Sequence, residues 1–80
     1  MSNKEKYDKV FMETFSIDEN NLNEKLEYNS IEVWDSIGHM QMIAELEDTF
    51  EIEFEMDDII DFSSYHKGFE ILTKYGVELK

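Results

Sequence analysis

Apolar residues recur every three to four positions along much of this chain, and that spacing predicts a helical fold. Residues 4–15 predict a first helix, and its apolar face consists of Tyr7, Val10, Phe11 and Phe15. Residues 63–76 predict a last helix, capped by Ser63 or Ser64 and ended by Gly76. The inner face of that helix consists of Tyr65, Phe69, Leu72 and Tyr75.

Two further helices are expected in the middle of the chain. The longer one begins at Asp35 or Ser36 and runs to about Glu51. Its buried stripe consists of Met40, Ile43, Leu46 and Phe50. The shorter one is "MDDIIDF", residues 56–62, which has acids in its first turn, where the helix dipole favours them. Residues 51–56, "EIEFEM", alternate as a strand does, but a lone strand has nothing to pair with, so we expect an extended linker.

Residues 16–35 lose the helical spacing and predict a long loop, with a helical turn around Asn23–Tyr28. The loop exceeds the usual length of connections in compact domains, and loops of this kind are commonly functional. The sequence therefore predicts a single all-α domain over residues 1–80. We expect a small four-helix bundle, with three main helices, a short third helix and a long first loop.

The charge of the chain restricts its partners. Twenty acids face seven lysines, there is no arginine, and the formal net charge is −13. Nucleic acids and anionic membranes repel such a surface, whereas a basic protein is attracted to it. Nine acids and no base lie between Glu45 and Asp61, which indicates either a docking surface for basic partners or a device for solubility.

Several classes of site are excluded by the residues present. The absence of cysteine excludes a disulfide framework, a thiolate zinc site and a cysteine nucleophile. His39 and His66 have no partner at metal-ligand spacing, and residues 18–29 lack the glycine and the final glutamate of a calcium loop. We therefore expect no metal site, no catalytic residues and no enzymatic activity. No segment has the features of a signal peptide or a membrane span, so a cytoplasmic monomer is expected.

Ser36 is the remaining candidate, because it stands where the second main helix begins. A hydroxyl there can cap a backbone N–H, or it can carry a phosphate, since the positive end of a helix favours an anion. Asp35 beside it can help a modifying enzyme to place Mg²⁺. Gly38 removes a side chain one turn into the helix and is expected to leave room for a bulky group. Both uses of Ser36 stay open at this point.

The stretch "DSIGHMQMIAELEDTFEIEF", residues 35–54, resembles the acyl carrier protein family. The attachment motif of that family, Asp-Ser-Leu, corresponds to Asp35-Ser36-Ile37. Its Leu-Glu-x-x-Phe element corresponds to residues 46–50, and Ile-x-Ile/Phe corresponds to residues 52–54. The length, the acidity and the four-helix layout extend the resemblance to nearly the whole chain.

The resemblance implies that Ser36 receives 4′-phosphopantetheine from coenzyme A through a separate Mg²⁺-dependent phosphopantetheinyl transferase. The thiol of this arm then holds acyl or aminoacyl groups as thioesters, which a loading ligase supplies and downstream transferases or synthases accept. Docking to basic patches on these enzymes would use Gln41, Glu45, Glu47, Asp48 and Glu51. Fatty cargo would enter a cavity lined by Met40, Ile43, Phe54, Ile59 and Phe62, unless these five residues are ordinary core.

The chain departs from the family pattern at Trp34, Gly38, His39, Gln41 and Glu55, which lie where partners contact carriers of this type. We therefore expect a carrier for a specialised pathway, such as polyketide tailoring, surface-polysaccharide modification or aminoacyl transfer, rather than bulk fatty-acid synthesis. A peptidyl-type carrier is disfavoured, because such domains are less acidic and lie in long multidomain chains. The alternative from another class is an unmodified acidic helical module that binds a basic partner and uses Ser36 only as a cap.

Overall fold

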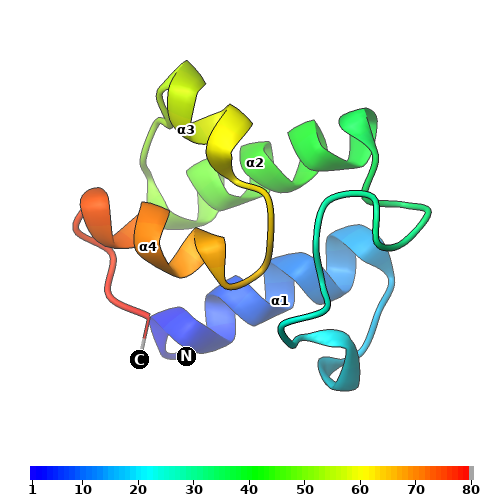
Figure 1. Ribbon diagram of the computed structural model, residues 1–80. Coiled ribbons are helices and arrows are strands. Elements are labelled where there is room, and N and C mark those ends of the chain that lie inside the picture. Colours follow the sequence, from blue (N-terminus) through cyan, green and yellow to red (C-terminus); the bar gives the residue numbers. More distant parts are fainter. Residues whose placement is uncertain (80) are drawn as a thin grey trace.

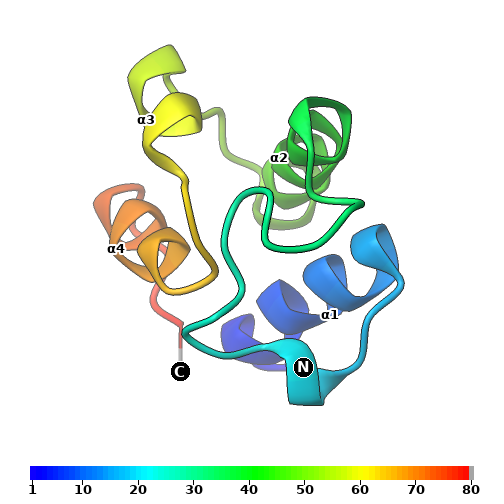
Figure 2. The same ribbon diagram turned by 45° about the vertical axis from the view of Figure 1, so that its right-hand side comes forward.

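The computed structural model describes residues 1–79 and contains four α-helices arranged as a bundle (Figures 1 and 2). These are α1 (Asn3–Phe15), α2 (Ser36–Phe50), α3 (Met56–Asp61) and α4 (Lys67–Lys74), with a short 3-10 helix, η1 (Glu19–Asn21), in the first loop. No strand is found over residues 1–79, so the all-α class, the short third helix and the extended linker before it are confirmed. None of the helices in this range is long and apolar enough to cross a membrane.

Helix α1 begins with a capping box, in which Ser2 Oγ accepts from the N–H of Glu5 and the Glu5 carboxylate accepts from the N–H of Ser2. Its predicted apolar face is buried. Phe11 is fully buried and packs against Trp34, with ring centroids 5.5 Å apart, and against Tyr65 at 5.4 Å. Helices α1 and α2 pack side by side and run in opposite directions, as Figure 1 shows. An aromatic cluster between α1, the first loop and α4 therefore forms the centre of the core.

The register of α2 differs in part from the prediction. Ile43 and Leu46 are buried as expected, but Met40 is 52% exposed and Met42 is fully buried in its place. The buried face thus passes through His39, Met42, Ile43 and Leu46. It has this phase because α2 lies against both α1 and Trp34 of the loop, which contacts the His39 ring.

The first loop is irregular, as predicted, but its helical turn lies elsewhere. Residues 23–28 form turns and one isolated antiparallel bridge, between Glu27 and Ser64. The 3-10 helix η1 precedes them, and the Asp18 side chain caps it by accepting from the N–H of Asn20. Leu26 and Trp34 are 3% and 0% exposed and anchor the loop in the core. Two backbone hydrogen bonds, Tyr28 N to Ser63 O and Tyr65 N to Leu26 O, attach it to the segment between α3 and α4.

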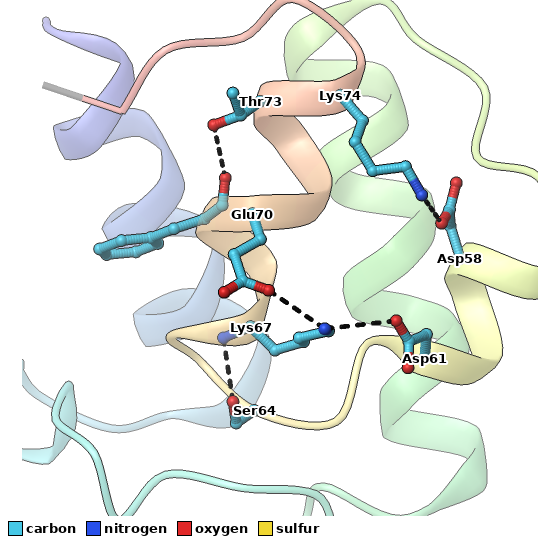
Figure 3. Close-up of polar contacts among 8 residues, drawn as sticks. Asp58, Asp61, Ser64, Lys67, Glu70, Thr73 and Lys74 are labelled. Atoms are coloured by element: carbon cyan, nitrogen blue, oxygen red, sulfur yellow. Dashed lines mark hydrogen bonds and ion pairs between the residues drawn. The ribbon is translucent and has the colours of Figure 1, made fainter.

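Helices α3 and α4 are joined by polar contacts (Figure 3). Lys74 Nζ lies 2.5 Å from Asp58 Oδ1, and Lys67 Nζ lies 3.5 Å from Asp61. Helix α4 begins at Lys67, later than predicted, although Ser64 Oγ does accept from the N–H of Lys67. It ends before Gly76, which takes the expected left-handed conformation with φ of 82°.

Candidate functional site at the start of α2

The first turn of α2 leaves the Ser36 hydroxyl free. Asp35 is the N-cap, because its Oδ1 accepts from the N–H of Gly38 at 2.8 Å, and Ser36 is the first residue of the helix. Ser36 is exposed, and within residues 1–79 its hydroxyl makes no hydrogen bond. The interpretation of Ser36 as a cap is therefore wrong: Asp35 does this work, and the serine side chain has no role in holding the helix end.

Gly38 permits a close approach of the preceding loop. A Cβ atom at this position would lie 1.9 Å from the Val33 carbonyl oxygen and 3.3 Å from the Phe15 ring. The expectation that Gly38 leaves room for an incoming group is thus wrong, since the loop backbone already fills that space. Any side chain here would push residue 33 away from the first turn of α2.

His39 is buried and bonded at both ring nitrogens, which the sequence did not indicate. Its Nδ1 accepts from the indole N–H of Trp34 at 3.0 Å, and its Nε2 lies 2.8 Å from the carbonyl oxygen of Ile59 in α3. The imidazole also stacks on the Trp34 ring, with centroids 6.2 Å apart and planes 14° from parallel. Among residues 1–79, no group of three or more potential ligands could hold a metal ion.

An open apolar cleft of about 390 Å³ lies beside Ser36, between the start of α2 and helix α3. Its lining residues are Tyr28, Ser36, His39, Met40, Met56, Ile59, Ile60, Phe62 and Ser63. Three of the five residues predicted to form a cargo cavity line it, namely Met40, Ile59 and Phe62. The other two, Ile43 and Phe54, are 2% and 7% exposed, belong to the core, and are absent from the cleft lining.

Large apolar side chains are exposed at this cleft, at Met40, Met56 and Ile60, and beside Ser36, at Ile37. Ile37, Met40, Met56 and Ile60 are between 52% and 74% exposed, and we call these four residues the apolar rim. Sequence reasoning missed three of them and had assigned Met40 to the core. The sequence of α3 did contain an indication that an apolar face would stay exposed. Met56 and Ile60 are four residues apart and share one face of the helix, while Ile59 lies on another. A six-residue helix packed on one side cannot bury both faces.

The acids predicted to dock partners lie further along α2. Gln41, Glu45, Asp48 and Glu51 are exposed. Glu47 is half-buried, and its carboxylate accepts from the N–H of Phe54 at 2.9 Å, so it holds the linker after α2 in place. Gln41 and Glu45 line a second, polar cleft of about 490 Å³ between α2 and α1. Four of the five side chains predicted to dock partners are therefore exposed, where a partner can contact them.

Polar contacts join helix α3, which forms one wall of the apolar cleft, to Lys74 and Tyr75. Lys74 donates to the Asp58 carboxylate, as does the Tyr75 hydroxyl at 2.6 Å. These two hydrogen bonds, that from Lys74 first, lower the pKa of Asp58 below its ordinary value, and the same contact raises the pKa of Lys74. Tyr75 Oη also accepts from the N–H of Glu55, just before α3.

Comparison with known proteins agrees with this site. Residues 34–66 match the family model described as phosphopantetheine attachment site. The matched segment runs from Trp34 through Ser36, α2 and α3 to the connection before α4. Domains of this family attach 4′-phosphopantetheine covalently and act as carriers rather than catalysts. No curated protein and no solved structure matches the chain.

Proposed function

We propose that this chain is a carrier of the acyl carrier type and that Ser36 is the residue that carries its phosphopantetheine arm, because residues 34–66 match the model of the phosphopantetheine attachment site. The observation that supports this is the free, exposed hydroxyl of Ser36 in the first turn of a helix whose cap is supplied by its neighbour. A phosphodiester fits this position, because the positive end of the α2 dipole favours an anion there.

The modification requires a transferase and coenzyme A. Ser36 Oγ forms a bond to the phosphorus that bears pantetheine, the bond from that phosphorus to the leaving adenosine bisphosphate breaks, and the hydroxyl proton passes to the transferase. When bound, the arm supplies a thiol that holds cargo as a thioester. The contribution of this chain is to present Ser36, with no competing hydrogen bond to break first.

The apolar cleft supports acyl or aminoacyl cargo of limited size. Met40, Ile59 and Phe62 offer apolar surface directly beside Ser36, in a volume of about 390 Å³. Ile43 and Phe54 behind it are closely packed. A cargo can therefore lie along the cleft without displacing the core.

Of the departures from the family pattern, Trp34, Gly38 and His39 are buried and cannot contact partners, contrary to the expectation. The two exposed departures, Gln41 and Glu55, together with the cleft, support a specialised pathway rather than bulk fatty-acid synthesis.

Partner enzymes would contact two different surfaces. The acids Glu45, Asp48 and Glu51, with Gln41, attract basic patches on a transferase, a loading ligase or a synthase. The apolar rim adds a surface next to Ser36 that can be buried in such a complex. Long-range attraction and short-range contact are thus supplied by different side chains.

The alternative function, an unmodified acidic module, gave Ser36 only the cap role. Asp35 occupies that role, so the alternative has no account of an exposed serine beside an apolar cleft.

The experiment that tests the proposal is an intact mass measurement. The unmodified chain is incubated with coenzyme A, Mg²⁺ and a phosphopantetheinyl transferase of broad specificity. The expected result is a gain of one phosphopantetheine in the parent and in Ser63→Ala, which alters the other serine on the cleft, and no gain in Ser36→Ala. Absence of modification in the parent would reject the carrier role, and modification of Ser36→Ala would assign the arm to another residue.

A further inference from the structure

His39 connects three segments that meet around Ser36. Through Nδ1 it binds Trp34, the last loop residue before the cap of α2. Its backbone N–H donates to the carbonyl oxygen of Asp35 at 2.8 Å, as the first backbone bond of α2, and its Nε2 lies 2.8 Å from the carbonyl oxygen of Ile59 in α3. Its side chain is 9% exposed and forms part of the cleft lining. One residue therefore touches the loop, the helix start and the opposite wall of the cleft.

The donors around the ring define its chemical state. An indole nitrogen can only donate, so Nδ1 of His39 must be the acceptor and carry no proton. The ring proton then resides on Nε2 and is donated to the Ile59 carbonyl oxygen. Both bonds are satisfied only by the neutral imidazole with its proton on Nε2. A protonated ring would place two N–H groups against each other at Trp34.

These bonds lie on both sides of Ser36 in the chain. The Asp35 carboxylate accepts from the N–H of Gly38, and the His39 ring accepts from Trp34, so the residues before and after the exposed Ser36 are joined to each other. We propose that His39 is a positioning residue, which clasps the loop and α3 to the start of α2 and thereby fixes the direction in which the Ser36 hydroxyl is presented. This inference rests on the proposed function, in which Ser36 is the residue modified.

An apolar residue of similar size at position 39 would fill the same space. The histidine differs from it in making two buried hydrogen bonds. Buried hydrogen bonds with both partners satisfied specify one arrangement, whereas apolar contacts tolerate small shifts. The imidazole lies between Trp34 on one side and Phe62 and Tyr28 on others, and its two bonds select one placement of Trp34 and α3. A displacement of about 1 Å at a reacting group can slow a reaction by about a hundredfold, so such precision matters at Ser36.

Four variants test the proposal. His39→Phe keeps a flat ring and removes both side-chain hydrogen bonds. His39→Gln offers one acceptor and one donor and is the conservative variant. Trp34→Phe removes the indole donor from the other end of the same bond. His66→Phe is the matched control, because it makes the same substitution at the other, exposed histidine.

The first measurement is the indole N–H resonance of Trp34, the sole tryptophan, in a nitrogen–proton correlation spectrum. In the parent it should be shifted downfield and exchange slowly with water, because it is bonded and buried. In His39→Phe it should move upfield, while in His66→Phe it should stay in place. An unchanged resonance in a folded His39→Phe would show that the bond to His39 is absent and would overturn the proposal.

The second measurement is transfer of phosphopantetheine to each variant, with kcat and KM determined separately. His39→Phe should lower kcat about tenfold, because the hydroxyl is misplaced, and leave KM unchanged, because the docking side chains are intact. His39→Gln should lie nearer to the parent. Trp34→Phe, which removes one of the two bonds, should lower kcat by less than His39→Phe does. The double variant should be no slower than His39→Phe alone, because the bond lost at Trp34 is already absent there.

The outcomes separate this inference from the proposed function. If the parent is modified and His39→Phe is folded and equally fast, only the positioning role fails. If His39→Gln is as slow as His39→Phe, or if the single effects add in the double variant, the bond is not the cause and the proposal is rejected. If His39→Phe does not fold, Trp34→Phe and His39→Gln give the same test. Failure of the parent to accept the arm concerns the proposed function instead.

Discussion

The two helices that flank α2 are held in different ways. Helix α1 presents Tyr7, Phe11 and Phe15 to the core, and none of these side chains is more than 2% exposed. Helix α3 leaves Met56 and Ile60 more than 70% exposed and packs Ile59 against the core only in part, and it has polar contacts at Asp58 and at the carbonyl of Ile59. Fully buried rings hold α1, whereas a partly buried isoleucine and a few hydrogen bonds hold α3.

This difference separates stability from function. A residue whose apolar surface is buried contributes to the whole fold, whereas a short helix held by polar contacts can open at a smaller cost in free energy. Ser36 and the cleft lie on the α3 side. Variants on the α1 side should therefore change the free energy of unfolding, and variants on the α3 side should change contacts with cargo and partners.

The largest effect is expected on the α1 side. Phe11→Ala should lower the free energy of unfolding by about 3–5 kcal/mol, because it removes a fully buried ring that contacts Trp34, Tyr65 and Phe62. Urea denaturation of the parent and the variant measures this difference. Ile60→Ala on α3 is the comparison, and an equal loss of stability in both variants would contradict the division between the two sides.

A smaller loss is expected at the junction of the loop and α2. Gly38→Ala should lower the free energy of unfolding by about 1–3 kcal/mol, because the new Cβ atom meets the Val33 carbonyl oxygen at 1.9 Å and the backbone must shift. Thermal and urea unfolding measure it. Gly76→Ala tests a different cause, since nothing lies within 4 Å of a Cβ there and only the positive φ opposes the change. A Gly38→Ala variant as stable as the parent would show that the loop adjusts freely.

The sequence predicted the helices well because their apolar spacing is regular, and it predicted the phase of α2 less well. Met40, Met42, Ile43 and Leu46 are compatible with two neighbouring stripes. The predicted stripe runs through Met40, Ile43, Leu46 and Phe50 and does not include His39. The stripe that forms includes His39, because Trp34 and Ile59 satisfy both of its nitrogens. That outcome depends on tertiary partners, which periodicity does not reveal.

The site was predicted to the correct helix start but not in its details. Asp35 and Ser36 are equally good N-caps by residue type. The structure decides between them through the extended backbone of Asp35, with φ of −104° and ψ of −168°, and the hydrogen bond from the N–H of Gly38 to its carboxylate. Similarly, the apolar residues of α3 predicted a helix without showing which face would stay exposed. Both answers come from how the loop and α3 pack against α2.

A cap and an attachment site predict different responses at these two neighbours. Asp35→Ala should lower the free energy of unfolding by about 1 kcal/mol, since it removes the acceptor for the N–H of Gly38. Ser36→Ala should change it by less than about 0.5 kcal/mol, because the hydroxyl has no partner over residues 1–79. Urea midpoints of the two variants measure the difference, and the reverse order would restore the cap role to Ser36.

The smallest effect on stability is expected at the apolar rim. A substitution there distinguishes most clearly between residues that stabilise the fold and residues that contact partners. Ile60→Ser should leave the free energy of unfolding within about 0.5 kcal/mol of the parent, because the side chain is 74% exposed. It should raise the KM of the phosphopantetheinyl transferase equally at low and high salt, because apolar contact is not screened. Glu45→Gln should also raise KM, but only at low salt, since ions screen an exposed charge. If both effects vanished in salt, the rim would have no part in docking, and α3 would serve only as a wall of the cleft.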